Sequence, residues 1–364
     1  MNSISKQLGE VVLGAALLML FSASIPAQSQ APLSEAGRIS ATLRSASYPE
    51  AIYPHGVMPD WDRGYVIHRE IEVNYSPGAA MVVMYDAAGK RIREGRIWPQ
   101  GAGSVRITRT AATREGAILA TGWALMQDGS APGFIAKTDL GGNTIQSVET
   151  GAFKPDQICE APDGSVWSLG KAVRSDGAPI PDTEVVRHFS FEKGLLHSFM
   201  PENMVQGVMN SDLPWFVSHG SFLRCGKEKV SIYLRFTGEY AEINTSSFEL
   251  KRWKLDQSVT QEREANGLAV TEDGRVYLSF RANGENVLHP MWGLYQIKAV
   301  PGNPVAELLP VAGTITPTDR GKFPPPGTFT MLWGADGNQL VVWRQEASDA
   351  SLSWVNVIHD ESTD

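Results

Sequence analysis

The sequence lacks the motifs that mark many enzyme active sites. It has no Gly-x-x-x-x-Gly-Lys-Ser/Thr phosphate loop, no Gly-x-Ser-x-Gly nucleophile turn, no His-Glu-x-x-His pair and no Cys-x-x-Cys. Its seven histidines are scattered, and no two stand at metal-ligand spacing. These absences exclude P-loop nucleotide chemistry, the α/β-hydrolase nucleophile and the common zinc-hydrolase motif.

Basic clusters are also missing. The chain has 32 Lys and Arg against 40 Asp and Glu, and the net charge of −8 is spread along it without a basic block or an acidic tail. Nucleic acids and anionic membranes both select clustered Lys and Arg. We therefore expect no nucleic-acid partner and no membrane contact beyond the N-terminal segment.

The N-terminal segment contains the longest apolar run, VVLGAALLMLFSASI at residues 11–25. The run is shorter than the roughly 20 residues of a transmembrane helix, and small residues at Ala27 and Ser29 follow it at signal-peptidase spacing. We predict a cleaved signal peptide over residues 1–29 and a secreted or periplasmic mature protein; an uncleaved signal anchor is the alternative. No Cys lies near the cleavage site, which argues against a lipid anchor.

After this segment no long 3.6-residue periodicity occurs, and one short pattern recurs instead. In REANGLAVTEDGRVYLSF (263–280) two apolar runs flank an acidic-Gly turn, and similar segments surround other glycines. Glycine accepts the positive φ of tight hairpin turns, and Asp bonds its own backbone there. The turn glycines of the series are Gly64, Gly116, Gly164, Gly274 and Gly337, with a degenerate copy at residues 226–234.

The spacing of these turns predicts the fold. It averages about 55 residues, and a second strand–turn–strand segment lies inside the repeats, for example at 81–97 and 133–150. Four strands per repeat of this length are typical of a β-propeller blade. We therefore predict an all-β, six-bladed β-propeller of four-stranded antiparallel blades over residues 30–364, in one domain and as a monomer.

The last repeat lacks a fourth strand before the chain ends, and GRISATLRS (37–45) precedes the first repeat without a place in it. The economical solution pairs this N-terminal strand with the C-terminal blade and so closes the ring.

Cysteine is scarce: the chain has two, Cys159 and Cys225. An exported chain permits a disulfide between them. However, Cys159 precedes its turn by about five residues and Cys225 by one to three, an offset of about 7 Å along strands whose sheets stand about 10 Å apart. A disulfide needs Cα atoms within about 7 Å. We therefore favour two free, buried thiols over a bond.

Two other groups of residues have a structural and a functional interpretation. Asp60 and Asp62 in PDWDRG fit an acidic turn between strands better than a cation-binding loop. Trp123, Trp167 and Trp343 fall in second strands, where packing between blades is favoured over a sugar-binding platform.

In a propeller, the loops that lead into the innermost strands converge at the axial mouth. The residues at these positions are His55, Ser104, Asp156, Asp212 or His219, Asn266 and Thr328. Asn266, Asp156 and Asp212 could bind Ca²⁺ or another divalent cation through oxygen. The alternative, which we favour, is that the mouth residues are solvated loop residues or turn formers.

Residues 265–280, ANGLAVTEDGRVYLSF, resemble the Asn-Gly-Leu-Ala segment of regucalcin- and gluconolactonase-like propellers, which are calcium-dependent lactonases. The resemblance covers about 16 residues closely and implies that Asn266 ligates a catalytic metal. Two departures stand beside it: Tyr53-Pro54-His55-Gly56 replaces the family's Glu-Gly-Pro motif, and PPPGTF (324–329) has no Ser-Asp-Gly. The wider pattern is similar to NHL-type propellers, which bind without catalysing.

Two functions follow. The first is an exported β-propeller that acts as a binding or interaction module for an unidentified small molecule, glycan or protein. The second is a metal (Ca)-dependent hydrolase or lactonase with its site in the axial mouth, where the cation would polarise a carbonyl and activate water. The sequence leaves open whether the protein is an enzyme.

Overall fold

The computed structural model describes residues 37–48, 60–69, 80–201, 221–235, 237–256, 260, 263–282, 293–312, 329–346 and 349–359. The chain divides into two units, Met1–Leu33 and Ser34–Asp364, and all described residues belong to the second. Among them, no helix is long and apolar enough to cross a membrane. The predicted signal peptide lies outside the described residues.

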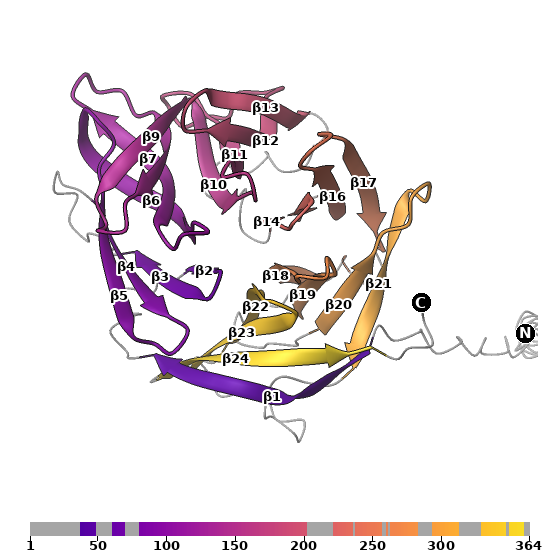
Figure 1. Ribbon diagram of the computed structural model, residues 1–364. Coiled ribbons are helices and arrows are strands. Elements are labelled where there is room, and N and C mark those ends of the chain that lie inside the picture. The colour runs from indigo at the N-terminus through magenta and orange to yellow at the C-terminus, as the bar shows by residue number, and fades with distance from the viewer. Residues whose placement is uncertain are drawn as a thin grey trace, which may run out of the picture. The chain divides into compact units, whose positions relative to one another are not determined.

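Strands form the architecture, in runs of four antiparallel strands that we call units (Figure 1). The first unit holds β2 (Asp60–Asp62), β3 (Tyr65–Arg69), β4 (Ala80–Asp86) and β5 (Arg91–Ile97). The second holds β6 (Ala102–Ala112), β7 (Ile118–Met126), β8 (Gly133–Thr138) and β9 (Thr144–Gly151). The third holds β10 (Phe153–Glu160), β11 (Val166–Ala172), β12 (Glu184–Ser190) and β13 (Gly194–Pro201).

The later units follow the same order. The fourth holds β14 (Phe222–Cys225), β15 (Lys229–Leu234), β16 (Glu239–Asn244) and β17 (Leu250–Leu255), and the fifth holds β18 (Arg263–Val270), β19 (Val276–Ala282), β20 (Gly293–Lys298) and β21 (Val305–Ala312). The sixth combines β22 (Phe329–Asp336), β23 (Gln339–Glu346) and β24 (Asp349–Ile358) with β1 (Gly37–Tyr48). The first strand of each unit lies nearest the centre (Figure 1).

This arrangement is a β-propeller, as predicted. The N-terminal strand also has its predicted place, because β1 runs antiparallel to β24 with Arg38 opposite Ile358 and Tyr48 opposite Ala350. The predicted count of six separate blades is not confirmed. Two short parallel pairings, β17 with β21 and β21 with β1, join the last three units into one twelve-stranded sheet.

The repeated turns form as their chemistry requires. All five glycines of the predicted series have positive φ, from +60° at Gly337 to +85° at Gly274. The Asp that precedes such a glycine also bonds the local backbone, as where Asp163 accepts from the Ser165 N–H at 2.9 Å. Glycine therefore adopts the positive φ that the turn requires, and Asp stabilises the turn through its hydrogen bond to the backbone.

The core lies between consecutive units rather than inside any one of them. Each of these apolar clusters combines buried side chains of two neighbouring units. Where the last unit meets the first, Trp61 and Val66 pack with Trp343 and Trp354. Trp167 and Trp343 are fully buried, so these two tryptophans pack between sheets, as favoured, and do not form a sugar platform.

The preference for two free thiols was wrong. Cys159 and Cys225 form a disulfide, with Cα atoms 5.7 Å apart. A spacing of roughly 10 Å holds for sheets that pack face to face with their planes parallel. Neighbouring propeller sheets diverge outwards from the axis, so β10 and β14, as innermost strands, approach far more closely than that.

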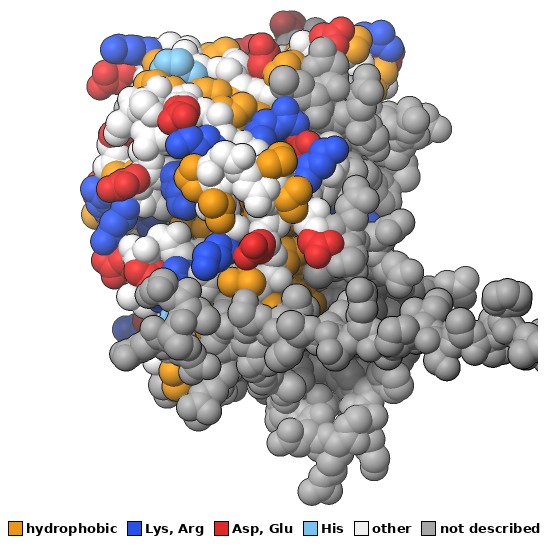
Figure 2. Space-filling view, turned by 90° about the vertical axis from the view of Figure 1, so that its right-hand side faces the viewer, with side chains coloured by type: hydrophobic (Ala, Val, Ile, Leu, Met, Phe, Trp, Pro, Cys, Tyr) orange, Lys and Arg blue, Asp and Glu red, His pale blue; other side chains and the backbone are white. Residues whose placement is uncertain are grey.

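Charged side chains are mixed on the visible surface. On the face shown in Figure 2, Lys and Arg are interspersed with Asp and Glu among apolar side chains. No patch of one sign dominates the described part of this face.

Candidate functional site

Four of the innermost strands carry a β-bulge. The register skips Asp156 in β10, Asn266 in β18 and Trp333 in β22, and it skips two residues in β6, Gly103 and Thr108. A bulge puts two residues opposite one and changes the direction in which a side chain points. The bulges therefore leave one residue, or two in β6, out of the strand pairing in each of four units, on the strands nearest the centre (Figure 1).

Two of the predicted site residues occupy these bulges. Asp156 and Asn266 are both half-buried. Ser104, the equivalent residue in the sequence prediction, pairs with Leu125 near the start of β6, between the bulge residues Gly103 and Thr108. Asp212, His55, His219 and Thr328 lie outside the described residues.

Asn266 is held by its own unit. Its Oδ1 accepts a hydrogen bond from the Ser279 hydroxyl on β19. The next residue, Gly267, lets β18 approach β22, because a Cβ there would lie 1.8 Å from the Leu332 carbonyl oxygen. The local sequence Asn-Gly thus combines a bulge residue with the close contact of two inner strands.

Asp60 is the anchor of a buried ion network. Its Oδ1 accepts from Arg109 Nη1 at 2.7 Å, its Oδ2 accepts from the Thr110 N–H at 2.8 Å, and Arg69 Nε lies 3.4 Å away. Burial would raise the pKa of Asp60, but Arg69, Arg109 and Thr110 together hold it below the ordinary value. Asp60 is therefore a charged bridge between the first and second units.

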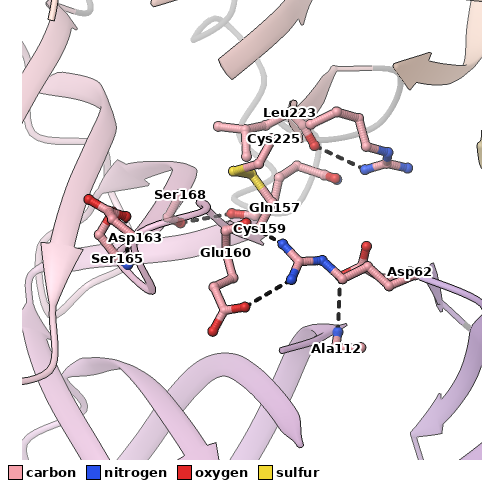
Figure 3. The surroundings of a disulfide bond; sticks show 12 residues. Asp62, Ala112, Gln157, Cys159, Glu160, Asp163, Ser165, Ser168, Leu223 and Cys225 are labelled. Atoms are coloured by element: carbon pink, nitrogen blue, oxygen red, sulfur yellow. Dashed lines mark hydrogen bonds and ion pairs between the residues drawn. A yellow bond between two sulfur atoms is a disulfide. The ribbon is translucent and has the colours of Figure 1, made fainter. Parts of the chain in front are cut away.

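Asp62 and Glu160 extend this network. Asp62 Oδ2 accepts from the Ala112 N–H at 3.0 Å, and burial raises the pKa of Asp62 despite the nearby Arg63. Glu160, which Figure 3 shows together with Asp62 and Ala112, accepts from Arg63 Nη1 at 2.9 Å and from the Arg114 N–H at 2.6 Å. Asp62 and Glu160 thus bind backbone N–H groups of the second unit, which indicates a structural role.

The predicted acidic turn at Asp60 and Asp62 is wrong. These residues are the first and last residues of strand β2. The turn that follows β2 includes Arg63 and Gly64.

Arg224 links units that are not neighbours in sequence. It lies on β14, and its Nη2 donates to the Trp333 carbonyl on β22 at 3.1 Å. Burial and the nearby Arg109 lower the pKa of Arg224 to about 10, and Asp62 and Asp60 oppose that shift. The centre of the ring therefore holds guanidinium groups from three units, Arg69, Arg109 and Arg224.

These charges bear on the predicted metal site. Asp156 lies in the electrostatic range of Arg69 and Arg109. Burial lowers the pKa of Arg69 although Asp60 and Asp156 oppose that shift, whereas against burial the same two carboxylates hold the pKa of Arg109 above its ordinary value. Arg109 Nε also donates to the Asp156 backbone carbonyl at 3.3 Å. Two guanidinium groups compete with a cation for the Asp156 charge. Across the part of the chain that the structure describes, no three His, Cys, Asp or Glu side chains form a group that could hold a metal.

Sequence reasoning missed the arginines. Arg69, Arg109 and Arg224 stand 40 and 115 residues apart, and no local pattern distinguishes them from surface arginines.

No protein-family model matches the chain, and no curated protein matches its sequence. Solved structures resemble it distantly. A candidate exported protein from Bacteroides fragilis shares 9% identity, with 90% of this chain and 95% of that chain covered and a TM-score of 0.46. A luciferin-regenerating enzyme shares 13%, with 86% and 96% covered and a TM-score of 0.44. The WD40 domain of Toxoplasma gondii coronin shares 7%, with 90% of each chain covered and a TM-score of 0.41. Likeness at this level carries no argument about function.

Proposed function

We propose that this protein is an exported binding module that takes a small polar ligand at the centre of its propeller. The observation that carries the proposal is the set of bulges on the innermost strands. In these bulges Asp156 and Asn266, which belong to two different units, are left out of the strand pairing. Arg109 directly follows the bulge residue Thr108.

The chemistry of these groups indicates the kind of ligand. Asp156 supplies acceptors, Asn266 supplies an amide, and Arg109 supplies guanidinium donors while 31% of its side chain is exposed. Such a mixed set suits a molecule with both hydroxyl and carboxylate groups, such as a sugar acid. The buried acids Asp60 and Glu160 hold the surrounding strands in place and take no direct part.

The test is a thermal-shift screen of neutral sugars, sugar acids and amino acids on the wild-type protein. A ligand that binds the folded state raises the Tm by mass action. We expect the shift to be lost in Asn266→Ala and in Asp156→Asn. Asp176→Asn, in an exposed turn between β11 and β12, serves as the control and should keep it. Binding that persists in both site variants would contradict the proposed location.

Export has its own support. The N-terminal run has the features of a signal peptide, and a disulfide bond is typical of proteins in oxidising compartments. Expression with the full N-terminus, followed by N-terminal sequencing of the mature chain, should find a start at residue 30. A cytoplasmic chain that keeps residue 1 would contradict export.

A metal-dependent hydrolase is the second candidate. It is favoured by one observation: Asp156 and Asn266 occupy the same bulge position in two inner strands. Titration of Ca²⁺, Mg²⁺, Mn²⁺ and Zn²⁺ into EDTA-treated protein decides it. A Tm rise with a hard cation that Asn266→Ala abolishes would favour this candidate, and a panel of lactones and esters would follow. No shift at millimolar concentration would exclude it.

A further inference from the structure

The Arg224 guanidinium is held by neutral groups alone among the described residues. Its Nη1 donates to the Leu223 carbonyl at 3.0 Å, and its Nη2 donates to the Trp333 carbonyl at 3.1 Å. No Asp or Glu in the described part of the chain forms an ion pair with it; the nearest carboxylates act on it only over a longer range. Arg224 is therefore a fixed positive charge without a carboxylate in direct contact.

The carboxylates near Arg224 are engaged elsewhere. Asp60 accepts from Arg109 Nη1 at 2.7 Å. Asp62 accepts from the Ala112 N–H at 3.0 Å, and burial raises the pKa of Asp62, which reduces its negative charge. Burial, followed by Arg109, lowers the pKa of Arg224 to about 10. Arg224 therefore keeps its charge at neutral pH, and an anion beside it would be favoured.

Arg224 lies at the inner ends of three units. It belongs to β14, and its partner carbonyl is that of the bulge residue Trp333 on β22; β18 lies between these two strands in the ring (Figure 1). The neighbouring carbonyl of β22, from Leu332, is the one that Gly267 approaches, directly after Asn266. Arg224 and Asn266 thus meet the same short segment of β22. The Arg224 side chain is half-buried, so solvent still reaches it.

The guanidinium has donors left for a ligand. Arginine carries five N–H donors in a planar fork, and two of those of Arg224 donate to the carbonyls of Leu223 and Trp333. One donor on each Nη and the Nε–H remain. Such a fork matches the paired oxygens of a carboxylate or a phosphate. Because the two carbonyls already orient the group, less side-chain entropy is lost when an anion binds.

We propose that Arg224 binds the oxyanion group of the ligand, a carboxylate or a phosphate, and that Arg109 adds a second positive charge beside it. Arg109 alone would hold such a group weakly, because Asp60 competes for its guanidinium. The inference rests on the proposed ligand-binding function, and it deepens that function by naming an acid, rather than a neutral sugar, as the ligand.

The experiment uses the mature protein with its disulfide intact. Inorganic phosphate and acetate are titrated separately by calorimetry at constant ionic strength, with glycerol as the uncharged control, and the Tm is followed in parallel. We expect one equivalent of at least one of the two anions to bind and to raise the Tm. Preference for acetate would indicate a carboxylate ligand, and preference for phosphate a phosphate ester. No binding of either anion by the wild type would overturn the inference.

Arg224→Gln is the decisive variant. Loss of hydrogen bonds to a charged group should reduce the anion affinity by about tenfold or more. Arg174→Gln is the matched control: it removes the same charge from an exposed turn, where 60% of the Arg174 side chain is exposed, and it should keep the affinity. Arg224→Lys serves if the glutamine variant does not fold. Lysine retains the charge without the planar fork, so its anion affinity should fall by a smaller factor.

The outcomes separate this inference from the proposed function. Anion binding that is unchanged in Arg224→Gln or in Arg224→Lys would overturn the inference, even if a screened ligand binds in an Asn266-dependent way. Anion binding that Arg224→Gln abolishes would support it, even if the screen finds no ligand that depends on Asn266 or Asp156.

Discussion

Buried carboxylate side chains link the inner strands of the first three units. Asp60 and Asp62 alternate along β2 and accept from Thr110 and Ala112, which alternate in the same way along β6. Backbone N–H groups that face another sheet thus gain charged acceptors, which form stronger hydrogen bonds than neutral groups. The ion network therefore stabilises the contact between one sheet and the next.

The variant Asp60→Asn tests whether the ion network stabilises the folded protein. Asp60 is 5% exposed, and its neutralisation removes the carboxylate that pairs directly with Arg69 and Arg109. We expect the free energy of unfolding to fall by about 3 kcal/mol, measured by urea denaturation. The exposed-turn variant Asp176→Asn should change it by less than about 0.5 kcal/mol. Equal effects of the two variants would show that the network contributes no stability.

The lowered pKa of His188 predicts that the free energy of unfolding depends on pH. Its folded pKa of about 4 is below the ordinary 6.5, first because of burial and second because of His197, while Asp163 opposes the shift. The folded state therefore favours the neutral ring. Its contribution is fully present above pH 6.5 and is lost as the pH falls towards 4, by up to about 3 kcal/mol.

The measurement is the free energy of unfolding from pH 7.5 to 4 in the presence of EDTA. Wild type is compared with His188→Phe, which preserves an aromatic ring beside Trp167. The stability of the variant should fall less steeply between pH 6.5 and 4. Parallel curves would refute the assignment to His188.

At the scale of elements, strand β14 depends on a covalent contact. It has four residues, Phe222–Cys225, and the disulfide joins its last residue to β10. Arg224 adds a hydrogen bond to Trp333 on β22. The pairing of β14 with β15 is short, so the disulfide and the Arg224 hydrogen bond to other units add to the stability of this strand.

Removal of the disulfide should lower stability. The bond closes a separation of 66 residues, which corresponds to at most about 4 kcal/mol of chain entropy in the unfolded state. Guanidinium unfolding with and without dithiothreitol measures the loss. The double variant Cys159→Ala/Cys225→Ala should be insensitive to reductant, and a wild-type protein that is equally insensitive would contradict the prediction.

At the scale of the whole molecule, ring closure depends on β1. This strand pairs with β24 along most of its length and touches β21 at its start. The two termini of the propeller are thereby joined in one sheet, and the buried side chains of the last unit, Leu352 and Trp354 among them, are held against the first.

A chain that begins at residue 49 should therefore be less stable than one that begins at Ser34, by at least about 3 kcal/mol. Loss of β1 uncovers the edge of β24 and the apolar side chains beneath it, each worth about 1.5–3 kcal/mol when buried. Calorimetry of both chains measures the difference. Equal Tm values would show that β1 does not close the ring.

The local pattern of the sequence was sufficient for the propeller and for β1. The signals for strands and turns are local: they are turn glycines, acidic turn residues and alternating apolar runs. Because each acts within a few residues, they can be recognised from the sequence alone. The same repeat assigned Asp156 and Asn266 to equivalent positions, and both occupy a bulge of their inner strand. Ser104 is paired with Leu125, between the bulge residues Gly103 and Thr108 of β6.

Only the tertiary structure decided which distant side chains meet. The disulfide joins residues 66 apart, and Asp60 pairs with Arg109 in another unit. The His188–His197 pair needed the register of β12 and β13, whose irregularity lies next to His188. Such contacts depend on the divergence of the sheets, on bulges and on register, and none of these leaves a periodic trace in the chain. The amino-acid sequence by itself determined the strands and their turns, while packing around the axis determined the chemistry that they bring together.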